Sequence, residues 1–219
     1  MKFEYTDVYG FEHAIRGMRN PKKSWSKSDS YPASLCEDNK FHFGENDLKL
    51  AQKLIVGGSE HRKFLRQICV WVDITAPLFW FKEQETYKIG TTSNSTSTMH
   101  TILSEKIAID CFETDDMEEF EKRGLKEIID LCEELRKRFL KTNDKKYWKA
   151  LIRMLPESWL QTRTISMNYE VIRNMVHQRK NHKLNEWSGV DDPLKPNFIS
   201  WAKTLPYAEE LIFYNGDKK

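Results

Sequence analysis

The sequence predicts a mixed α/β protein in which a mostly antiparallel sheet is flanked by helices. The clearest strand is an alternating run, in which Gln67, Cys69, Trp71 and Asp73 face one side and the opposite side carries Ile68, Val70, Val72 and Ile74. Such a period of two is typical of a half-buried strand. Residues 160–167 form a second strand candidate, and residues 3–5 a shorter one. Two or three strands among many helical stretches favour this fold class.

The remaining chain is mostly helical in its spacing of apolar residues. Helices are predicted over residues 11–18, 45–56, 78–87, 99–109, 115–141, 144–154, 168–182, 198–203 and 206–214, with irregular structure over 19–28 and 32–45. We expect Asn46 to cap the second of these helices, and Thr75 to cap the third, with Pro77 in its first turn. The helix 115–141 has an apolar stripe of Phe120, Leu125, Ile128, Ile129, Leu131, Leu135 and Phe139.

Composition limits the class of protein. The 219 residues contain 39% hydrophobic residues and no recognisable linker, so we expect a single domain over residues 1–219. Mean hydropathy is −0.68, no apolar run approaches the roughly 18 to 20 residues that span a bilayer, and residues 1–10 lack a signal peptide's apolar region. We therefore expect a cytoplasmic protein without a membrane partner. The net charge of +2 argues against a strongly basic nucleic-acid-binding protein.

The cysteines predict neither a disulfide nor a zinc site. Cys36, Cys69, Cys111 and Cys132 are far apart and form no CxxC pair. The histidines also lack the spacing of metal ligands, so no metal is expected. Motifs for dinucleotide folds, P-loops, zinc proteases and serine hydrolases are absent from the sequence.

Two stretches are candidates for a binding site. In the first, the alternating strand and the aromatic helix 78–87 lead into a loop of hydroxyl and amide side chains over residues 91–98. A rigid strand and helix that deliver polar groups to a loop are a common way to hold a small polar ligand. The alternative is a core strand, a helix and a serine-rich surface loop. His61, just before the strand, is either a ligand-facing group or an exposed loop residue.

The second stretch is the densest cationic region of the chain, made of Arg173, His177, Arg179, Lys180, His182 and Lys183. Arginine offers a planar fork that binds phosphate or the imide edge of a pyrimidine at two points. The alternative is a solvated basic helix surface, which we favour for Lys180 and Lys183. Arg163 lies on a strand between apolar residues, so we expect it to be buried with an anionic partner.

Together the two stretches resemble the flavin-dependent thymidylate synthase family. The resemblance covers most of the chain and lies in the order in which the sequence patterns follow one another. The family has Gly-His-Glu-Thr before a strand, then Ala-Pro, an aromatic helix and a polar signature; this chain has Gly58-Ser-Glu-His, the strand, Ala76-Pro77-Leu-Phe and the polar loop. Downstream, the family's pattern is matched by Leu155-Pro156, Thr162-Arg163, Asn168, Asn174 and Arg179. The N-terminal Ala14-Ile-Arg-Gly-Met-Arg followed by Ser24 is similar to the family's opening.

The family signature R-H-R-x-x-S-x-N-E-x-S-x-R is the main point of departure. Aligned without a gap, it falls on Thr86, Tyr87, Lys88, Thr91, Ser93, Asn94, Thr96 and Thr98. Lys88 keeps a positive charge, and Thr91 and Thr96 keep hydroxyl groups. In the family this signature contacts flavin and the nucleotide phosphate.

The resemblance implies reductive methylation of a deoxyuridine monophosphate (dUMP). Methylenetetrahydrofolate would supply the carbon, and FAD reduced by NADPH the hydride. By the same resemblance, Arg179 is the catalytic residue, because it would stabilise negative charge on the pyrimidine. The implied FAD contacts are His61, Tyr87, Lys88, Asn94, Asn168 and Asn174. The implied nucleotide contacts are Glu83, Ser95, Ser97, Arg163 and Arg179. The family assembles its sites between the subunits of a tetramer, so a homo-oligomer is expected.

Three alternatives stay open. The altered signature is also consistent with an enzyme of the same fold that hydroxymethylates another pyrimidine nucleotide. A non-catalytic nucleotide-binding or interaction protein would keep the fold without turnover. The third reading is an unrelated α/β protein whose basic helix contacts nucleic acid. Under the favoured reading, the cationic and amide side chains of the late helix lie against the hydroxyl-rich segment.

Overall fold

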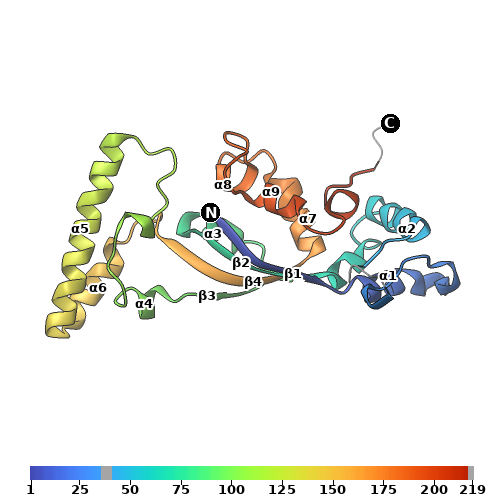
Figure 1. Ribbon diagram of the computed structural model, residues 1–219, viewed down its shortest axis with the longest axis horizontal. Coiled ribbons are helices and arrows are strands. Elements are labelled where there is room, and N and C mark those ends of the chain that lie inside the picture. Colours follow the sequence, from blue (N-terminus) through green and yellow to red (C-terminus); the bar gives the residue numbers. More distant parts are fainter. Residues whose placement is uncertain (36–40, 217–219) are drawn as a thin grey trace.

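A single four-stranded antiparallel sheet is the centre of the molecule. The structure is a computed structural model that describes residues 1–35 and 41–216. Its strands lie in the order β1-β2-β4-β3, with β1 at Lys2–Tyr9, β2 at Cys69–Pro77, β4 at Leu160–Asn168 and β3 at Thr92–Ser95 (Figure 1). The predicted mixed α/β class with an antiparallel sheet is therefore confirmed.

The alternation in β2 determines which face of the sheet is covered. Val70, Val72 and Ile74 are fully buried, whereas Trp71 between them is 42% exposed. The helix α3 (Leu78–Gln84) and the helices α7 (Tyr169–Arg179), α8 (Asn185–Ser188) and α9 (Phe198–Lys203) lie over the buried face (Figure 1). The core beneath them contains Trp80 and Trp187, whose ring centroids are 4.6 Å apart. We call the opposite side, which carries Trp71, the open face.

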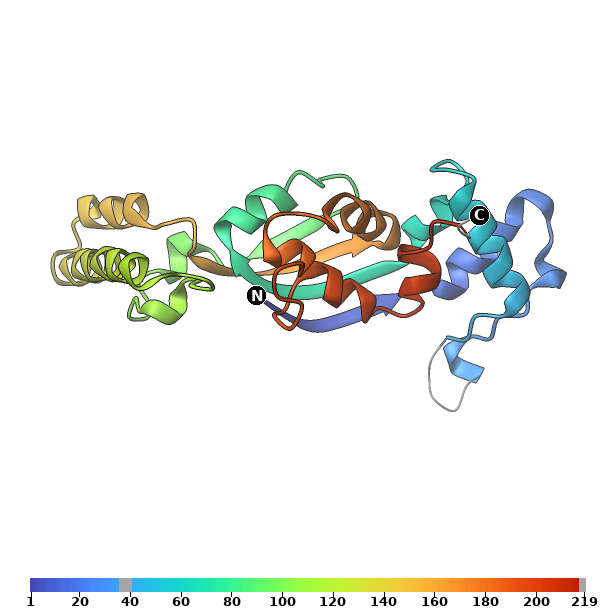
Figure 2. The ribbon, with the colours of Figure 1, turned by 90° about the horizontal axis from the view of Figure 1, so that it is seen from above.

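Helices also extend the molecule at both ends of the sheet (Figure 2). One end has α1 (Phe11–Arg19) and α2 (Glu45–Val56), and the other has α4 (Thr98–Thr101), α5 (Glu119–Thr142) and α6 (Lys145–Met154). The α5–α6 pair has its own apolar cluster, made of Ile102, Ile107, Phe112, Leu125, Ile129, Cys132 and Leu151. Short 3-10 turns lie at Asn20–Lys22, Trp25–Lys27, Ala33–Leu35, Lys63–Gln67 and Ile109–Cys111, and a π-helical turn at Ala208–Ile212.

The polar segment after α3 differs most from its prediction. Residues predicted as a loop include the edge strand β3, which pairs with β4 through Thr92–Ser95. Thr75 does not cap α3, because β2 continues through Pro77 and the Thr75 hydroxyl lies 2.7 Å from that of Thr162. The helix α3 also ends at Gln84, earlier than predicted.

Several other boundaries were predicted wrongly. Of the helix expected over residues 99–109, only the short α4 and a 3-10 turn form. The helix α5 begins at Glu119 rather than Asp115, because Glu118 and Glu121 form a capping box, and its Phe120 and Leu131 are exposed. Gly44 rather than Asn46 occupies the N-cap of α2, where the Asp29 carboxylate accepts hydrogen bonds from the Asn46 and Asp47 amides. The helix α7 ends at Arg179, and α8 was not predicted.

The cysteines within the described residues, Cys69, Cys111 and Cys132, are free thiols, while Cys36 lies outside those residues. The irregular segment predicted over 32–45 also lies partly outside them, at residues 36–40. Across the described ranges 1–35 and 41–216, none of the helices combines the length and the apolar character that crossing a membrane requires.

Candidate functional site

Arg179 is held at the C-terminal end of α7 by aromatic and acidic groups. Its Nε donates a hydrogen bond of 3.1 Å to the Tyr87 hydroxyl, and its Nη1 lies 3.1 Å from Glu83 Oε2. The guanidinium carbon is 5.2 Å from the ring centroid of Trp187. Cationic stacking and a charged partner therefore fix the direction of this side chain, which keeps 21% of its surface exposed.

Arg163 is held in a similar way on β4. Its side chain is largely buried, its Nη1 forms an ion pair with Glu85, and its Nε donates 2.9 Å to Gln161 Oε1. The guanidinium carbon lies 4.0 Å from the ring centroid of Phe81. The predicted burial with an anionic partner is confirmed. Ser95 of β3 lies directly opposite Arg163 in the sheet register.

The segment that follows α3 runs alongside α7. Asn168 caps α7, since its Oδ1 accepts a hydrogen bond of 3.0 Å from the Val171 amide. A Cβ atom placed on Gly90 would lie 2.8 Å from the Asn168 amide nitrogen and 3.2 Å from Val171. Further along α7, Gln178 accepts a hydrogen bond of 2.8 Å from the Tyr87 hydroxyl. The residues from Tyr87 to Gly90 therefore contact both ends of α7.

Asn174 lies between these two contacts on α7. Residues three and four apart share a helix face, so Asn174 faces the same side as Val171 and Gln178. Its side chain is half-buried and has no hydrogen-bond partner within the described ranges. The hydroxyl oxygen of Thr91 is also buried without a described partner. A buried polar group without a partner is costly, so the Thr91 hydroxyl calls for an explanation such as a bound water or ligand. The Asn174 amide is only half-buried and can also bind solvent.

The two arginines lie on opposite flanks of the end of α3. Residues two apart on a helix point about 200° away from each other, and Glu83 and Glu85 are such a pair. Glu83 binds Arg179 and Glu85 binds Arg163. Arg179 contacts Glu83 and Tyr87, which precede the hydroxyl-rich segment 91–98, and Arg163 on β4 lies opposite Ser95 within that segment. The predicted contact between the late helix and the hydroxyl-rich segment therefore stays a prediction for Arg179.

The other predicted residues are not all gathered on that side. Asn94 pairs with Thr164, whose hydroxyl binds Asp73 on the open face, so Asn94 is on the open face as well. Lys88 and His61 are exposed, and neither side chain has a partner among the residues described. Ser97 caps the short α4, where its carbonyl accepts a hydrogen bond of 2.9 Å from the Thr101 hydroxyl.

The cationic block of α7 is divided by the fold. Arg173 is buried and donates to the carbonyls of Ile212 at 2.8 Å and of Tyr214, so it holds the C-terminal segment. Burial, and then the nearby Arg62, lowers the pKa of Arg173 to about 10. His177 Nε2 lies 3.1 Å from the same Ile212 carbonyl, and burial lowers its pKa. Lys180 and Lys183 are exposed, as we favoured.

Sequence reasoning missed three contacts of the two arginines. Trp187, Gln161 and Glu85 contact Arg179 or Arg163 directly. Glu85 was visible as an acidic residue at the end of the aromatic helix. Trp187 carried no local signal, because it lies in the unpredicted α8 and reaches Glu83 across a long sequence separation.

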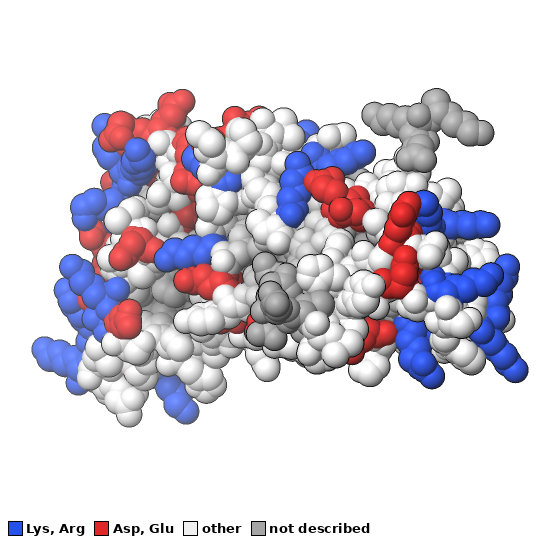
Figure 3. All heavy atoms as spheres, turned by 45° about the vertical axis from the view of Figure 1, so that its right-hand side comes forward, with Lys and Arg blue, Asp and Glu red and all other residues white. Residues whose placement is uncertain are grey.

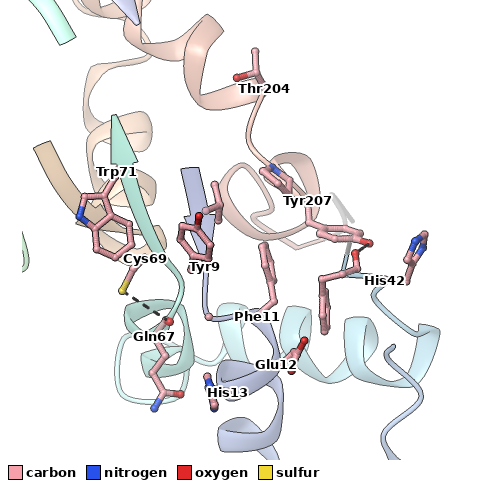
Figure 4. A pocket seen from close by; sticks show the side chains of 14 residues that line it. Tyr9, Phe11, Glu12, His13, His42, Gln67, Cys69, Trp71, Thr204 and Tyr207 are labelled. Carbon is pink, nitrogen blue, oxygen red and sulfur yellow. Dashed lines mark hydrogen bonds between the residues drawn. The ribbon is translucent and has the colours of Figure 1, made fainter. Parts of the chain in front are cut away.

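A large cavity lies elsewhere, between β1, β2, α1 and the C-terminal segment. Its volume is about 940 Å³. Tyr9, Phe11, Trp71 and Tyr207 give it an aromatic wall, with Cys69 and Gln67 in contact nearby (Figure 4). None of the predicted site residues lines this cavity. The candidate site is therefore the region around Arg163, Arg179 and Asn174, which lies outside this cavity.

The surface in Figure 3 shows how charge is distributed on one side. Basic side chains gather toward both ends of the visible face with acidic side chains among them, and further basic and acidic side chains adjoin each other in its upper middle. Among the described residues of this face, basic side chains therefore alternate with acidic ones.

Comparison with known proteins was informative only at the level of structure. No protein-family model and no curated protein matches the chain. A crystal structure of the flavin-dependent thymidylate synthase ThyX from Helicobacter pylori, complexed with FAD and dUMP, superposes with a TM-score of 0.67 at 16% identity, covering 97% of this chain and 98% of the other. A second structure of that enzyme with FAD and dUMP gives 0.71 at 16% identity, covering 97% of each chain.

The chain has the fold of the flavin-dependent thymidylate synthases. The likeness spans nearly the whole length of both proteins, so the order of patterns in the sequence indicated the right fold. At 16% identity the likeness shows the fold alone.

Proposed function

We propose that this protein is a nucleotide-binding flavoprotein that methylates dUMP reductively in the cytoplasm. Methylenetetrahydrofolate supplies the one-carbon unit, and NADPH supplies the reducing equivalents through FAD. One observation carries the proposal: in a chain with this fold, the stretch 83–95 contacts Arg163, Asn168 and Arg179 together. These are the residues that the family resemblance assigns to nucleotide and flavin.

The polar groups along α7 fit a flavin. Asn174 has a free amide and Thr91 an unsatisfied buried hydroxyl, which suit the carbonyl, imide and hydroxyl groups of FAD. In this proposal Asn168, Asn174, Tyr87, Lys88 and His61 hold the cofactor, and Lys88 faces its phosphates. Bound FAD would supply the hydride that reduces the transferred carbon.

Arg179 is proposed to act on the pyrimidine. Its fixed guanidinium donates one hydrogen bond, to Tyr87, and forms an ion pair with Glu83, so the remaining N–H groups can donate to a pyrimidine carbonyl. Stabilising negative charge on that oxygen raises the nucleophilicity of the ring carbon, so no protein nucleophile is needed. Arg163, Ser95 and Ser97 are proposed to contact the rest of the nucleotide, with Glu83 positioning Arg179.

We propose a homo-oligomer, by resemblance a tetramer, and the positions of the candidate residues support this proposal. Asn94 is on the open face, whereas Ser95 and Arg163 are on the covered face. Asn94 is assigned to the flavin, and Ser95 and Arg163 are assigned to the nucleotide, and these two ligands must lie side by side to react. We therefore propose that residues of a second copy bring the two sets together. Light scattering on the purified protein is expected to give a multiple of 26.0 kDa; a monomer at working concentration contradicts a shared site.

A second candidate function is hydroxymethylation of another pyrimidine nucleotide. The observation that favours it is the loss of the signature arginines at Thr86 and Thr98, since substrate choice depends on such contacts. Mass analysis of the product distinguishes the two, because the added hydroxymethyl group is one oxygen heavier than a methyl group, whichever pyrimidine carries it.

The proposed function is tested by spectrum and turnover together. The purified protein, or the protein after incubation with FAD, is expected to show flavin absorbance near ~450 nm and to convert dUMP when methylenetetrahydrofolate and NADPH are added. A colourless protein that cannot be reconstituted with FAD contradicts the proposal and favours a non-catalytic nucleotide-binding protein.

A further inference from the structure

Three hydrogen-bond donors converge on one carboxylate oxygen at the Arg179 site. Glu83 Oε2 accepts 2.9 Å from the indole Nε1 of Trp187, and lies 3.1 Å from Arg179 Nη1 and 3.3 Å from His182 Nε2. Trp187 is fully buried, and the Arg179 and His182 side chains are mostly buried. Such an arrangement of donors is typical of an anion-binding position. Here the chain fills the position with its own side chain.

Glu83 also compensates the charge of Arg179 without consuming its donors. The guanidinium donates its Nε–H to Tyr87 and forms an ion pair with Glu83, and its Nη N–H groups donate no hydrogen bond to the residues described. An incoming phosphate would place negative charge beside the Glu83 carboxylate, which repels it. An uncharged carbonyl oxygen meets no such repulsion and can accept from the remaining N–H groups.

We propose that Glu83 is a specificity-determining residue that excludes anionic groups from Arg179 and leaves this arginine to bind an uncharged carbonyl. The identity of that carbonyl as part of a pyrimidine rests on the proposed function, whereas the exclusion of anions does not. The phosphate of a nucleotide must then be bound by other cations than Arg179.

The chain provides a matched control at Glu85. Glu83 and Glu85 lie on the same turn at the end of α3, and each pairs with one arginine. Removing either carboxylate changes the net charge of the region by the same amount. Only Glu83 shares its oxygen with the indole of Trp187. A general electrostatic effect would therefore appear in both variants, and a local effect only in one.

The experiment measures binding of inorganic phosphate, without flavin or nucleotide, to the full-length protein. Titration calorimetry is run on the wild type, Glu83→Gln, Glu83→Ala, Glu85→Gln and the double variant Glu83→Gln/Arg179→Ala. The amide of Glu83→Gln still offers an oxygen to the Trp187 indole, and Glu83→Ala removes the same charge without a new polar group. The indole N–H resonance of Trp187, assigned by NMR, reports whether phosphate binds at this position.

The proposal predicts that phosphate binds at least about tenfold more tightly to a folded Glu83 variant than to the wild type, with a shift of the Trp187 resonance. The gain is lost in the double variant and does not occur in Glu85→Gln. Unchanged phosphate affinity in the Glu83 variants overturns the proposal, and so does an equal gain in Glu85→Gln. Failure of both Glu83 variants to fold overturns it as well, because Glu83 would then be a structural residue. None of these outcomes depends on turnover, so they are separate from a failure of the proposed function.

Discussion

Gly90 and Asn168 approach each other so closely that a Cβ atom at position 90 would lie 2.8 Å from the Asn168 amide nitrogen. Gly90 also has a φ of +80°, in the region that residues with a side chain rarely adopt. This contact joins the segment after α3 to the N-terminal cap of α7. It therefore sets the distance between the two parts of the candidate site.

Gly90→Ala is expected to destabilise the protein by about 1–3 kcal/mol, because the new Cβ strains the backbone and also clashes with Asn168. Flavin affinity is expected to fall in parallel, since Asn168 must move. Thermal unfolding and a flavin titration measure the two effects. The control is Gly124→Ala, in the interior of the helix α5. The added Cβ meets no atom within 4 Å there, and alanine favours the helix, so stability is expected to rise slightly. Equal stability of the two variants contradicts the role of the Gly90–Asn168 contact.

Arg179→Ala is expected to lower nucleotide affinity or turnover by roughly 1–3 kcal/mol while the protein remains folded. Folding survives because Glu83, which loses its arginine, is 34% exposed and keeps the hydrogen bond from Trp187. Steady-state kinetics and circular dichroism measure the two properties. The exposed neighbour Lys180 provides the control, since Lys180→Ala removes the same charge one residue away. If both variants keep wild-type kinetics, Arg179 does not contact the substrate.

Asn174→Ala tests the flavin contact on α7. Asn174 has no hydrogen-bond partner in the described parts of the chain, so its loss should leave the unfolding temperature nearly unchanged. The FAD dissociation constant is expected to rise about tenfold, the equivalent of one hydrogen bond. Fluorescence quenching of free FAD measures this constant. A variant that binds FAD as the wild type does would exclude Asn174 from the cofactor site.

Asp47 is expected to make stability depend on acid pH. Burial alone would raise its pKa, but hydrogen bonds from Ser30, Ser28 and Arg19 lower it below its ordinary value of 3.8. Because the folded pKa is below the unfolded one, Asp47 contributes its stability above about pH 4 and loses it as the pH falls through the folded pKa.

Asp47→Asn should therefore lower the free energy of unfolding near neutral pH by about 3–5 kcal/mol, because Arg19 is left without its buried partner. Urea unfolding between pH 3 and pH 7 measures the effect. The free energy of unfolding is expected to fall less on acidification in the variant than in the wild type. If the free energy of unfolding depends on pH in the same way in the wild type and the variant, Asp47 does not cause the acid-induced loss of stability.

Elements were predictable from the sequence where their burial pattern or their capping residue is local in the chain. The strand β2 was predictable because the buried residues Val70, Val72 and Ile74 alternate with residues that are less buried. The start of α7 was predictable because Asn168 caps it locally. The edge strand β3 was not, because Thr92–Ser95 is exposed along its length and its pairing depends on the backbone of β4 rather than on an apolar pattern.

The contacts of the site residues could not be predicted, because their partners are far away in the sequence. The burial of Arg163 with an anion was predicted from its place on a strand, but its partner Glu85 is 78 residues away. Arg173 and Arg179 are indistinguishable as sequence, yet one binds C-terminal carbonyls and the other Glu83 and Tyr87. Phe120 and Leu131 matched a helical stripe but are exposed, since α5 packs through Leu125, Ile129 and Cys132.

The most direct test of the central claim is a crystal structure of the protein with FAD and dUMP added. We expect the nucleotide beside Arg179 and the flavin along Asn174 and Thr91, with residues of a second copy completing the site. Binding of both ligands in the aromatic cavity near Tyr9 and Trp71, away from Arg179 in every copy, would contradict the account.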